Sequence, residues 1–200
     1  LGMDVRIGTG NASKGELVCC TPFVSMPIEF WNDADGSRYK EAYFSRGDGH
    51  WWHGDMIENT RSQGSCGGIV VHGRSDAILK PGGVRIGTAE IYRVVESLSQ
   101  VEDSIVVGQP WRGDIRVVLF VKLTSNVMLD DELRRSIQKR LGQEASARHV
   151  PSLIIQVPEI PYTRSGKKVE LAVRAIVCGD EPSNRESLAN PASLDYFEKL

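Results

Sequence analysis

The chain has 200 residues, of which 40% are apolar and 25% charged, and its formal net charge is −2 at neutral pH. This composition is typical of a globular protein with one large or two small domains, and it gives no electrostatic reason to expect a nucleic-acid partner. There is no apolar run of the ~18 residues needed by a membrane-spanning helix. The first residues also lack the pattern of a secretory signal, so we expect no membrane partner.

The cysteines and histidines give no sign of a metal site or a disulfide framework. The four cysteines form no C-x-x-C pair, and they are Cys19, Cys20, Cys66 and Cys178. Adjacent Cys19 and Cys20 would point to opposite faces of a strand. We therefore predict reduced thiols in a cytoplasmic protein. The four histidines show no metal-ligand spacing, so the sequence predicts no metal ligand in this chain.

The first part of the chain has the signals of short antiparallel strands with one helical insert. Apolar runs alternate with polar segments rich in Gly, Asn and Ser, which mark turns. Because Gly-Asp is turn chemistry, we expect the strand at 51–55 to end in a tight turn. The predicted elements are strands at 15–20 (GELVCC), 51–55 (WWHGD) and 68–72 (GIVVH), a helical turn at 38–44 (RYKEAYF) and a hairpin loop at 60–68 (TRSQGSCGG).

The second part of the chain alternates helical and strand patterns. Apolar residues at helical spacing predict a helix from about Thr88 and another over 129–141. Acidic residues begin the second of these helices and basic residues end it, which suits the helix dipole, and Gly142 is the expected C-cap. Buried strands are predicted at 104–107, 115–123 and 153–157, and a last helix at 169–177.

These patterns predict an α+β protein. A short antiparallel β subdomain at 1–72 is joined by a hinge at 73–76 to a small carboxyl-terminal domain at 77–178. We expect that domain to have a central β-sheet flanked by helices. The remaining residues, 179–200, are polar and broken by prolines, and we expect them to extend over a surface as a tail.

Several residues are candidates for chemistry, each with a simpler alternative. Lys167, in PYTRSGKK, is a flexible cation suited to phosphate or carboxylate charge, or a member of a solvated basic loop. Asp55 could accept hydrogen bonds from two neighbouring sugar hydroxyls, or form an Asx-turn. Arg74 is a fixed fork of donors, whose simpler role is to pair with Asp76. Asp76 is a turn cap or a hinge residue that absorbs dihedral change.

The order of four motifs is more specific than any of them alone. Along the chain they are GELV (15–18), HGD (53–55), GRSDAILKPGGVRIGTAEIY (73–92) and PYTRSGKK (161–168). In this order they resemble the motifs of the adenylate-forming superfamily of acyl-CoA synthetases. The runs IEFWNDADGSRYKEAYFS, SARHVPSLI and NRESLANPASLDYF are most similar to its acetoacetate-activating members, so the resemblance covers the whole chain.

The resemblance implies a ligase that works in two steps. The acid, here acetoacetate, is first joined to ATP to give an acyl-adenylate and pyrophosphate, and the acyl group then passes to the thiol of CoA. Lys167 matches the catalytic lysine, which bridges the carboxylate and the α-phosphate. Asp55 matches the residue that holds the ribose hydroxyls, with Arg74 as a second ribose contact.

Other positions are implied in the second step. Asp76 matches the hinge about which the small domain rotates between steps. After rotation, the turn at Gly82 and Gly83 would face the active site and leave room for the pantetheine thiol of CoA. Glycine keeps the backbone thin where a narrow ligand must pass. Arg85 is then expected to contact phosphate.

Three family features have no counterpart in the sequence: the phosphate-binding loop, the adenine-binding segment and the glutamate that holds Mg²⁺. We therefore expect a fragment that is inactive alone and whose partner is the missing amino-terminal part of the same enzyme. Mg²⁺ is expected for the full-length enzyme, with its ligand outside this chain. The alternatives are another short-chain acyl-CoA synthetase, using acetate or propionate, and a non-catalytic domain that retains the fold.

Overall fold

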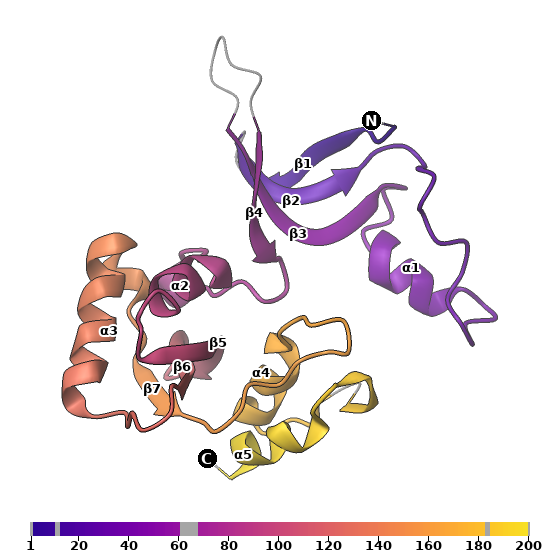
Figure 1. Cartoon of the computed structure of the whole chain (residues 1–200). Helices are drawn as coiled ribbons and strands as arrows, with labels where there is room; N and C mark the ends of the chain where they lie inside the picture. The colour runs from indigo at the N-terminus through magenta and orange to yellow at the C-terminus, as the bar shows by residue number, and fades with distance from the viewer. Residues whose placement is uncertain (1, 11–12, 61–67, 183–184, 200) are drawn as a thin grey trace. The chain divides into compact units, whose positions relative to one another are not determined.

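The computed structural model describes residues 2–10, 13–60, 68–182 and 185–199. The chain divides into two compact units, Leu1–Asp76 and Ala77–Leu200, so the division follows the last residue of the GRSD motif (Figure 1). Most of the predicted hairpin loop at 60–68 lies outside the described residues, as does Cys66. No helix in the described part of the chain has both the length and the apolar character needed to cross a membrane.

The first unit is built on a four-stranded antiparallel sheet with the strand order β1-β2-β3-β4. Its elements are β1 (Val5–Gly10), β2 (Lys14–Cys19), α1 (Ser37–Phe44), β3 (Trp51–Asn59) and β4 (Ile69–Arg74). The buried ring of Trp51 stacks on Tyr43 of α1, with ring centroids 3.6 Å apart. Aromatic packing of this kind attaches the polar helix α1 to the sheet.

The predicted tight turn at the end of WWHGD is wrong. β3 continues through Gly54 and Asp55 to Asn59. Gly54 has a φ of +80°, and the pairing of β3 with β4 shifts register between Met56 and Ile57. A glycine inside a strand often marks such an irregularity, which locally resembles a turn in sequence.

The second unit contains a three-stranded sheet with the order β5-β6-β7, in which β5 and β6 are antiparallel and β6 and β7 parallel. Its strands are β5 (Val101–Trp111), β6 (Asp114–Leu123) and β7 (Leu153–Gln156). Its helices are α2 (Thr88–Val95), α3 (Asp131–Glu144), α4 (Glu170–Cys178) and α5 (Asp195–Glu198). The α+β prediction, with helices flanking a central sheet, is confirmed, although α3 continues past the expected cap at Gly142.

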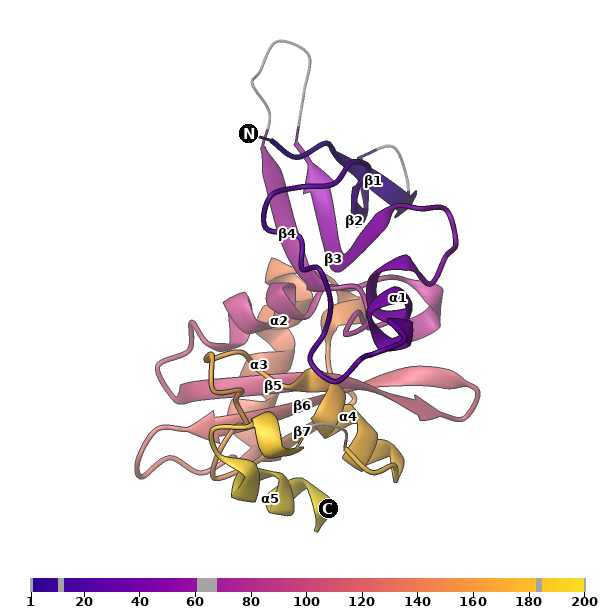
Figure 2. The same ribbon diagram turned by 90° about the vertical axis from the view of Figure 1, so that its right-hand side faces the viewer.

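The sheet of the second unit is buried on both faces. Val117, Leu119 and Val121 of β6 belong to one apolar cluster, together with residues of α2 and α3. Val118 and Phe120, which alternate with them, belong to a second cluster with α4 and the last residues of the chain. Because successive side chains of a strand point to opposite faces, β6 supplies both cores. The helices accordingly lie on the two sides of the sheet (Figure 1, Figure 2).

The segment after Gly179 differs from the extended polar tail expected from the sequence. Leu188, Leu194 and Phe197 are buried in the second cluster, and the Phe197 ring lies 4.9 Å from that of Phe120 between centroids. The segment also holds the loop at 161–168, because the backbone N–H of Ala189 donates to the carbonyl of Tyr162 at 2.8 Å. Three scattered apolar residues therefore turn a polar segment into part of the domain.

We predict that Phe197→Ala lowers the unfolding free energy of the second unit by about 3–5 kcal/mol, the usual cost of truncating a buried phenylalanine. The adjacent Tyr196 is 41% exposed, and Tyr196→Ala is its matched control, expected to change the unfolding free energy by about 0.5 kcal/mol or less. Urea denaturation followed by circular dichroism measures both. Equal effects of the two substitutions would contradict the packing described for the tail.

Candidate functional site

In the first unit, the structure brings together Asp55, Arg74 and Asp76. Asp55 and Arg74 are paired across β3 and β4, and the Arg74 Nη1 lies 3.7 Å from Asp55 Oδ1. The same guanidinium donates to the carbonyl of His53 at 3.0 Å and to Asp76 Oδ2 at 3.1 Å. Arg74 thus makes the simpler pair with Asp76 and also lies within ion-pair distance of Asp55.

Gly54 suits its position because its φ of +80° is rarely adopted by residues with a side chain, and because the Arg74 side chain lies close to its backbone. A Cβ at Gly54 would lie 2.6 Å from Arg74 Nη2, closer than real contacts allow. The guanidinium therefore crosses directly over the backbone of the HGD motif. The HGD and GRSD motifs lie apart in the sequence, but strand pairing and the contacts of Arg74 bring them together.

Glu16 of the GELV motif joins this group and was not singled out by the sequence. It is buried, and its Oε1 accepts a hydrogen bond from the Ser75 hydroxyl at 3.2 Å. Its Oε2 pairs with Arg46 at 2.9 Å. The backbone N–H of Ser75 also donates to the Gly54 carbonyl at 2.7 Å, so the residue before Asp76 is held from two sides. A carboxylate inside an otherwise apolar strand was the available signal.

In the second unit, the predicted Gly82-Gly83 turn is a short 3-10 segment, Pro81–Gly83, in which both glycines have positive φ, +56° and +77°. The Gly82 N–H donates to both carboxylate oxygens of Asp114 at 3.0 Å. Hydrogen bonds from the N–H groups of Ile115 and Gly82 lower the pKa of Asp114, so it accepts as a carboxylate. The turn is therefore attached to the first residue of β6.

A pocket of about 460 Å³ adjoins this turn. Its lining includes Gly82, Trp111 and three arginines, Arg112, Arg116 and Arg148. The Arg116 guanidinium lies 3.8 Å from the centre of the Trp111 ring, and Arg148 Nη1 donates to the Pro81 carbonyl at 3.3 Å. Clustered guanidinium groups of this kind suit phosphate oxygens. Arg85 follows the glycine turn closely in the sequence, and its side chain is exposed. It has no ion-pair partner in the described part of the chain.

Lys167 lies at the end of a tight loop that fixes its backbone and leaves its side chain exposed. The Thr163 N–H donates to the Lys167 carbonyl at 2.8 Å, and the Lys167 N–H donates to the Thr163 hydroxyl at 3.0 Å. Gly166 has a φ of +76°, which suits glycine at this position. Within the residues that the structure describes, the Lys167 ammonium has no ion-pair partner.

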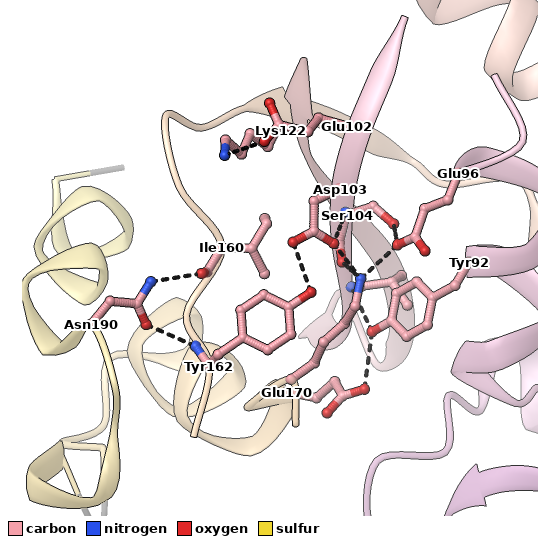
Figure 3. Close-up of polar contacts among 12 residues, drawn as sticks. Tyr92, Glu96, Glu102, Asp103, Ser104, Lys122, Ile160, Tyr162, Glu170 and Asn190 are labelled. Atoms are coloured by element: carbon pink, nitrogen blue, oxygen red, sulfur yellow. Dashed lines mark hydrogen bonds and ion pairs between the residues drawn. The ribbon is translucent and has the colours of Figure 1, made fainter. Parts of the chain in front are cut away.

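The side chain of Lys168, unlike that of Lys167, is held by ion pairs. The sequence alone does not distinguish the two lysines. The Lys168 Nζ pairs with Glu96 at 2.5 Å and Asp103 at 2.6 Å, and it lies 4.4 Å from the centre of the Tyr92 ring. Figure 3 labels these three partners. The Tyr162 hydroxyl donates to the other oxygen of Asp103 at 2.8 Å. Burial and this hydrogen bond raise the pKa of Tyr162, so its hydroxyl remains a donor at neutral pH.

The glycine turn and the Lys167 loop of the second unit pack against different apolar clusters. Leu79 and Ile86, which flank the glycine turn, belong to the apolar cluster on the α2 and α3 side. Ile160 and Tyr162, which precede Lys167, belong to or pack against the cluster on the α4 side. The glycine turn and Lys167 are therefore separate features, each supported by its own core.

Among the described residues, no group of three or more His, Cys, Asp or Glu side chains is arranged to hold a metal ion.

Comparison with known proteins agrees with this architecture. Residues 90–167 match the AMP-binding enzyme C-terminal domain. The chain is 56% identical over 203 aligned residues to an acetoacetyl-coenzyme A synthetase of Rhizobium meliloti (strain 1021), covering 100% of this chain and 31% of the relative. It is 46% identical to the acetoacetyl-CoA synthetase of Gallus gallus, covering 94% and 28%.

Solved structures of two CoA synthetases or ligases are also similar to this chain. An acetoacetyl-CoA synthetase from Streptomyces lividans superposes with a TM-score of 0.85 at 38% identity, covering 98% of this chain and 30% of that one. The anthranilate CoA ligase AuaEII shares the fold, with a TM-score of 0.69 at 20% identity, over 84% of this chain and 32% of its own. The chain thus spans about 30% of the length of the acetoacetyl-CoA synthetases that it matches. The chain is thus similar along its length to acetoacetyl-CoA synthetases, and its residues 90–167 match the AMP-binding enzyme C-terminal domain.

Proposed function

We propose that the chain acts as part of an acid–thiol ligase that uses ATP to activate acetoacetate and then transfers the acyl group to CoA. The products are acetoacetyl-CoA, AMP and pyrophosphate. The names of the relatives at 46–56% identity support acetoacetate as the acid. The isolated chain is expected to be inactive, because its sequence has no phosphate-binding loop. ATP and CoA bind as substrates, and Mg²⁺ is held by residues outside this chain.

The observation that carries the proposal is the attachment of the two motif loops at opposite ends of the β5–β6 hairpin, where each packs against its own apolar cluster. A ligase with two successive steps needs different groups near the same reacting carbonyl at different times. A small domain with the Lys167 loop at one end of this hairpin and the Gly82-Gly83 turn at the other meets this need by rotating. Asp76, at the division between the two units, is the hinge about which it rotates.

In the first step, Lys167 supplies positive charge where negative charge develops. Its ammonium bridges the acid carboxylate and the α-phosphate of ATP as the pentavalent phosphorus forms. A cation already positioned there stabilises the transition state without reorganisation. Asp55 accepts hydrogen bonds from the ribose hydroxyls, and Arg74, which is 53% exposed, adds a second ribose contact. Arg85 contacts a phosphate group only in the second step, after the rotation.

In the second step, the Gly82-Gly83 turn allows the pantetheine arm of CoA to approach closely. The absence of side chains on the turn leaves a thin backbone at that point. The adjoining arginine-lined pocket suits the phosphates of the CoA nucleotide, and its volume of about 460 Å³ accommodates a group of that size. The thioester then forms by attack of the CoA thiol on the adenylate carbonyl, with AMP as leaving group.

The free thiols Cys19, Cys20 and Cys178 agree with a cytoplasmic location.

The first test is Lys167→Ala in the full-length ligase. We expect acetoacetate-dependent ATP–pyrophosphate exchange to fall by about 100-fold or more, because an electrostatic contact to the transition state is lost. Thioester formation from supplied acetoacetyl-adenylate should stay close to that of the unaltered enzyme. Acetate and propionate serve as comparison acids, and exposed Lys199 provides the control Lys199→Ala. Unchanged exchange in Lys167→Ala would overturn the role of this lysine and favour a non-catalytic domain.

The second test is Gly82→Ala, which should impair thioester formation selectively. A Cβ at Gly82 would lie 2.1 Å from Arg148 Nη1 and occupy the path of the pantetheine arm. We expect the thioester step to slow by about 10-fold or more, because reacting groups misplaced by ~1 Å lose much of their rate. ATP–pyrophosphate exchange should be preserved. The control is Gly179→Ala, which has a similar positive φ of +86° but open space around its Cα. Equal loss in both steps would argue against this role.

A further inference from the structure

A single carboxylate, that of Asp103 on β5, holds both ends of the loop that carries Lys167 (Figure 3). Asp103 Oδ2 accepts the hydroxyl hydrogen bond of Tyr162 at 2.8 Å. Its Oδ1 accepts from the Lys168 ammonium at 2.6 Å. Tyr162 and Lys168 also form an isolated antiparallel bridge with each other. The loop is therefore closed at its base by one acidic side chain from the sheet.

The contact is largely withdrawn from water. The Lys168 side chain is 16% exposed and that of Asp103 18%. Besides Asp103, the Lys168 ammonium contacts a carboxylate oxygen of Glu96 and the carbonyl of Ser104. An ammonium group has three N–H donors, so these three acceptors use all of them. Its charge also lies near the face of Tyr92, an additional attraction.

The same loop is held from the other side by the final segment of the chain. The Tyr162 N–H donates to the Asn190 side chain at 2.9 Å, and Asn190 also donates to the Ile160 carbonyl at 2.9 Å (Figure 3). Thr163 forms a further bridge with Leu188. Between these attachments, Lys167 is exposed and directed by a backbone that has little freedom.

We infer that Asp103 and Lys168 are positioning residues, which fix the Lys167 loop so that its ammonium is delivered to the reacting phosphate in one orientation. The inference rests on the proposed function of Lys167. A lysine side chain is long and flexible, so the position of its ammonium depends strongly on the direction of its backbone. Catalytic groups must be held within about 0.5 Å of their working geometry, which requires supporting contacts behind them.

A purely structural role for the Asp103–Lys168 pair makes a different prediction. Breaking a buried ion pair leaves one charge without a partner and destabilises the domain. Loss of stability would impair both steps of the reaction, because both need the folded second unit. A positioning role impairs adenylation alone, since the thioester step uses the glycine turn, which is attached at the other end of the β5–β6 hairpin.

The test is Asp103→Asn in the full-length ligase, compared with Glu102→Gln. Glu102 is the preceding residue of β5 and pairs with Lys122 at 2.5 Å on the exposed surface, so the control removes an equal charge from the same strand (Figure 3). We expect Asp103→Asn to lower ATP–pyrophosphate exchange by about 10-fold or more, as for a catalytic group misplaced by ~1 Å. Thioester formation from supplied adenylate should match that of Glu102→Gln.

Two milder variants keep the inference testable if Asp103→Asn does not fold. Tyr162→Phe removes only the hydroxyl that reaches Asp103, and it should lower adenylation in the same selective way. Lys168→Arg keeps a cation at the site and should retain more adenylation activity than Lys168→Met. In the 200-residue chain itself, hydrogen exchange at the amides of Thr163 and Lys167 should be faster in Tyr162→Phe than in Glu102→Gln.

The outcomes separate this inference from the proposed function. If Lys167→Ala abolishes exchange but Asp103→Asn and Tyr162→Phe behave like Glu102→Gln, the positioning role is wrong and the function of Lys167 stands. If Lys167→Ala retains exchange, the proposed function fails and the inference fails with it. If Asp103→Asn and Tyr162→Phe slow both steps equally, the pair is structural and the inference is also overturned.

Discussion

The pairing of β5 with β6 is the interaction on which the second unit depends. The two strands are antiparallel and pair from Val101 with Leu123 to Trp111 with Asp114. Their alternating side chains enter one core with α2 and α3 and another with α4 and the end of the chain. The middle of this hairpin is buried on both faces and is stiff, because its successive side chains are fixed alternately in the two packed cores.

This hairpin also supplies the carboxylates that hold the two motif loops. Asp103 lies near the beginning of β5 and binds the Lys167 loop through Tyr162 and Lys168. Asp114, the first residue of β6, binds the glycine turn through the N–H of Gly82. Since β5 and β6 are antiparallel and joined by a short turn, these two carboxylates lie at opposite ends of the hairpin. One rigid element therefore sets the position of both candidate sites.

Sequence reasoning was most successful where local periodicity determines structure. The apolar spacing of Ile91, Val94 and Val95 predicts α2 because those side chains share one buried face. It failed where a distant partner decides the outcome. Gly54 looks like a turn residue, but it lies inside β3 and has the Arg74 guanidinium of the neighbouring strand over its backbone. Lys168 looks like Lys167, but its partners lie more than 60 residues away along the chain.

The internal attachment of both loops follows from the proposed rotation. A domain that presents first one face and then the other leaves each face without its partner surface during part of the cycle. A loop that depended on that surface for order would lose its conformation at every turnover and regain it at an entropic cost. Asp103 and Asp114 remove this dependence, because each belongs to the same domain as the loop that it binds. The loop that is not in use stays formed, and each rotation needs to move only a rigid body.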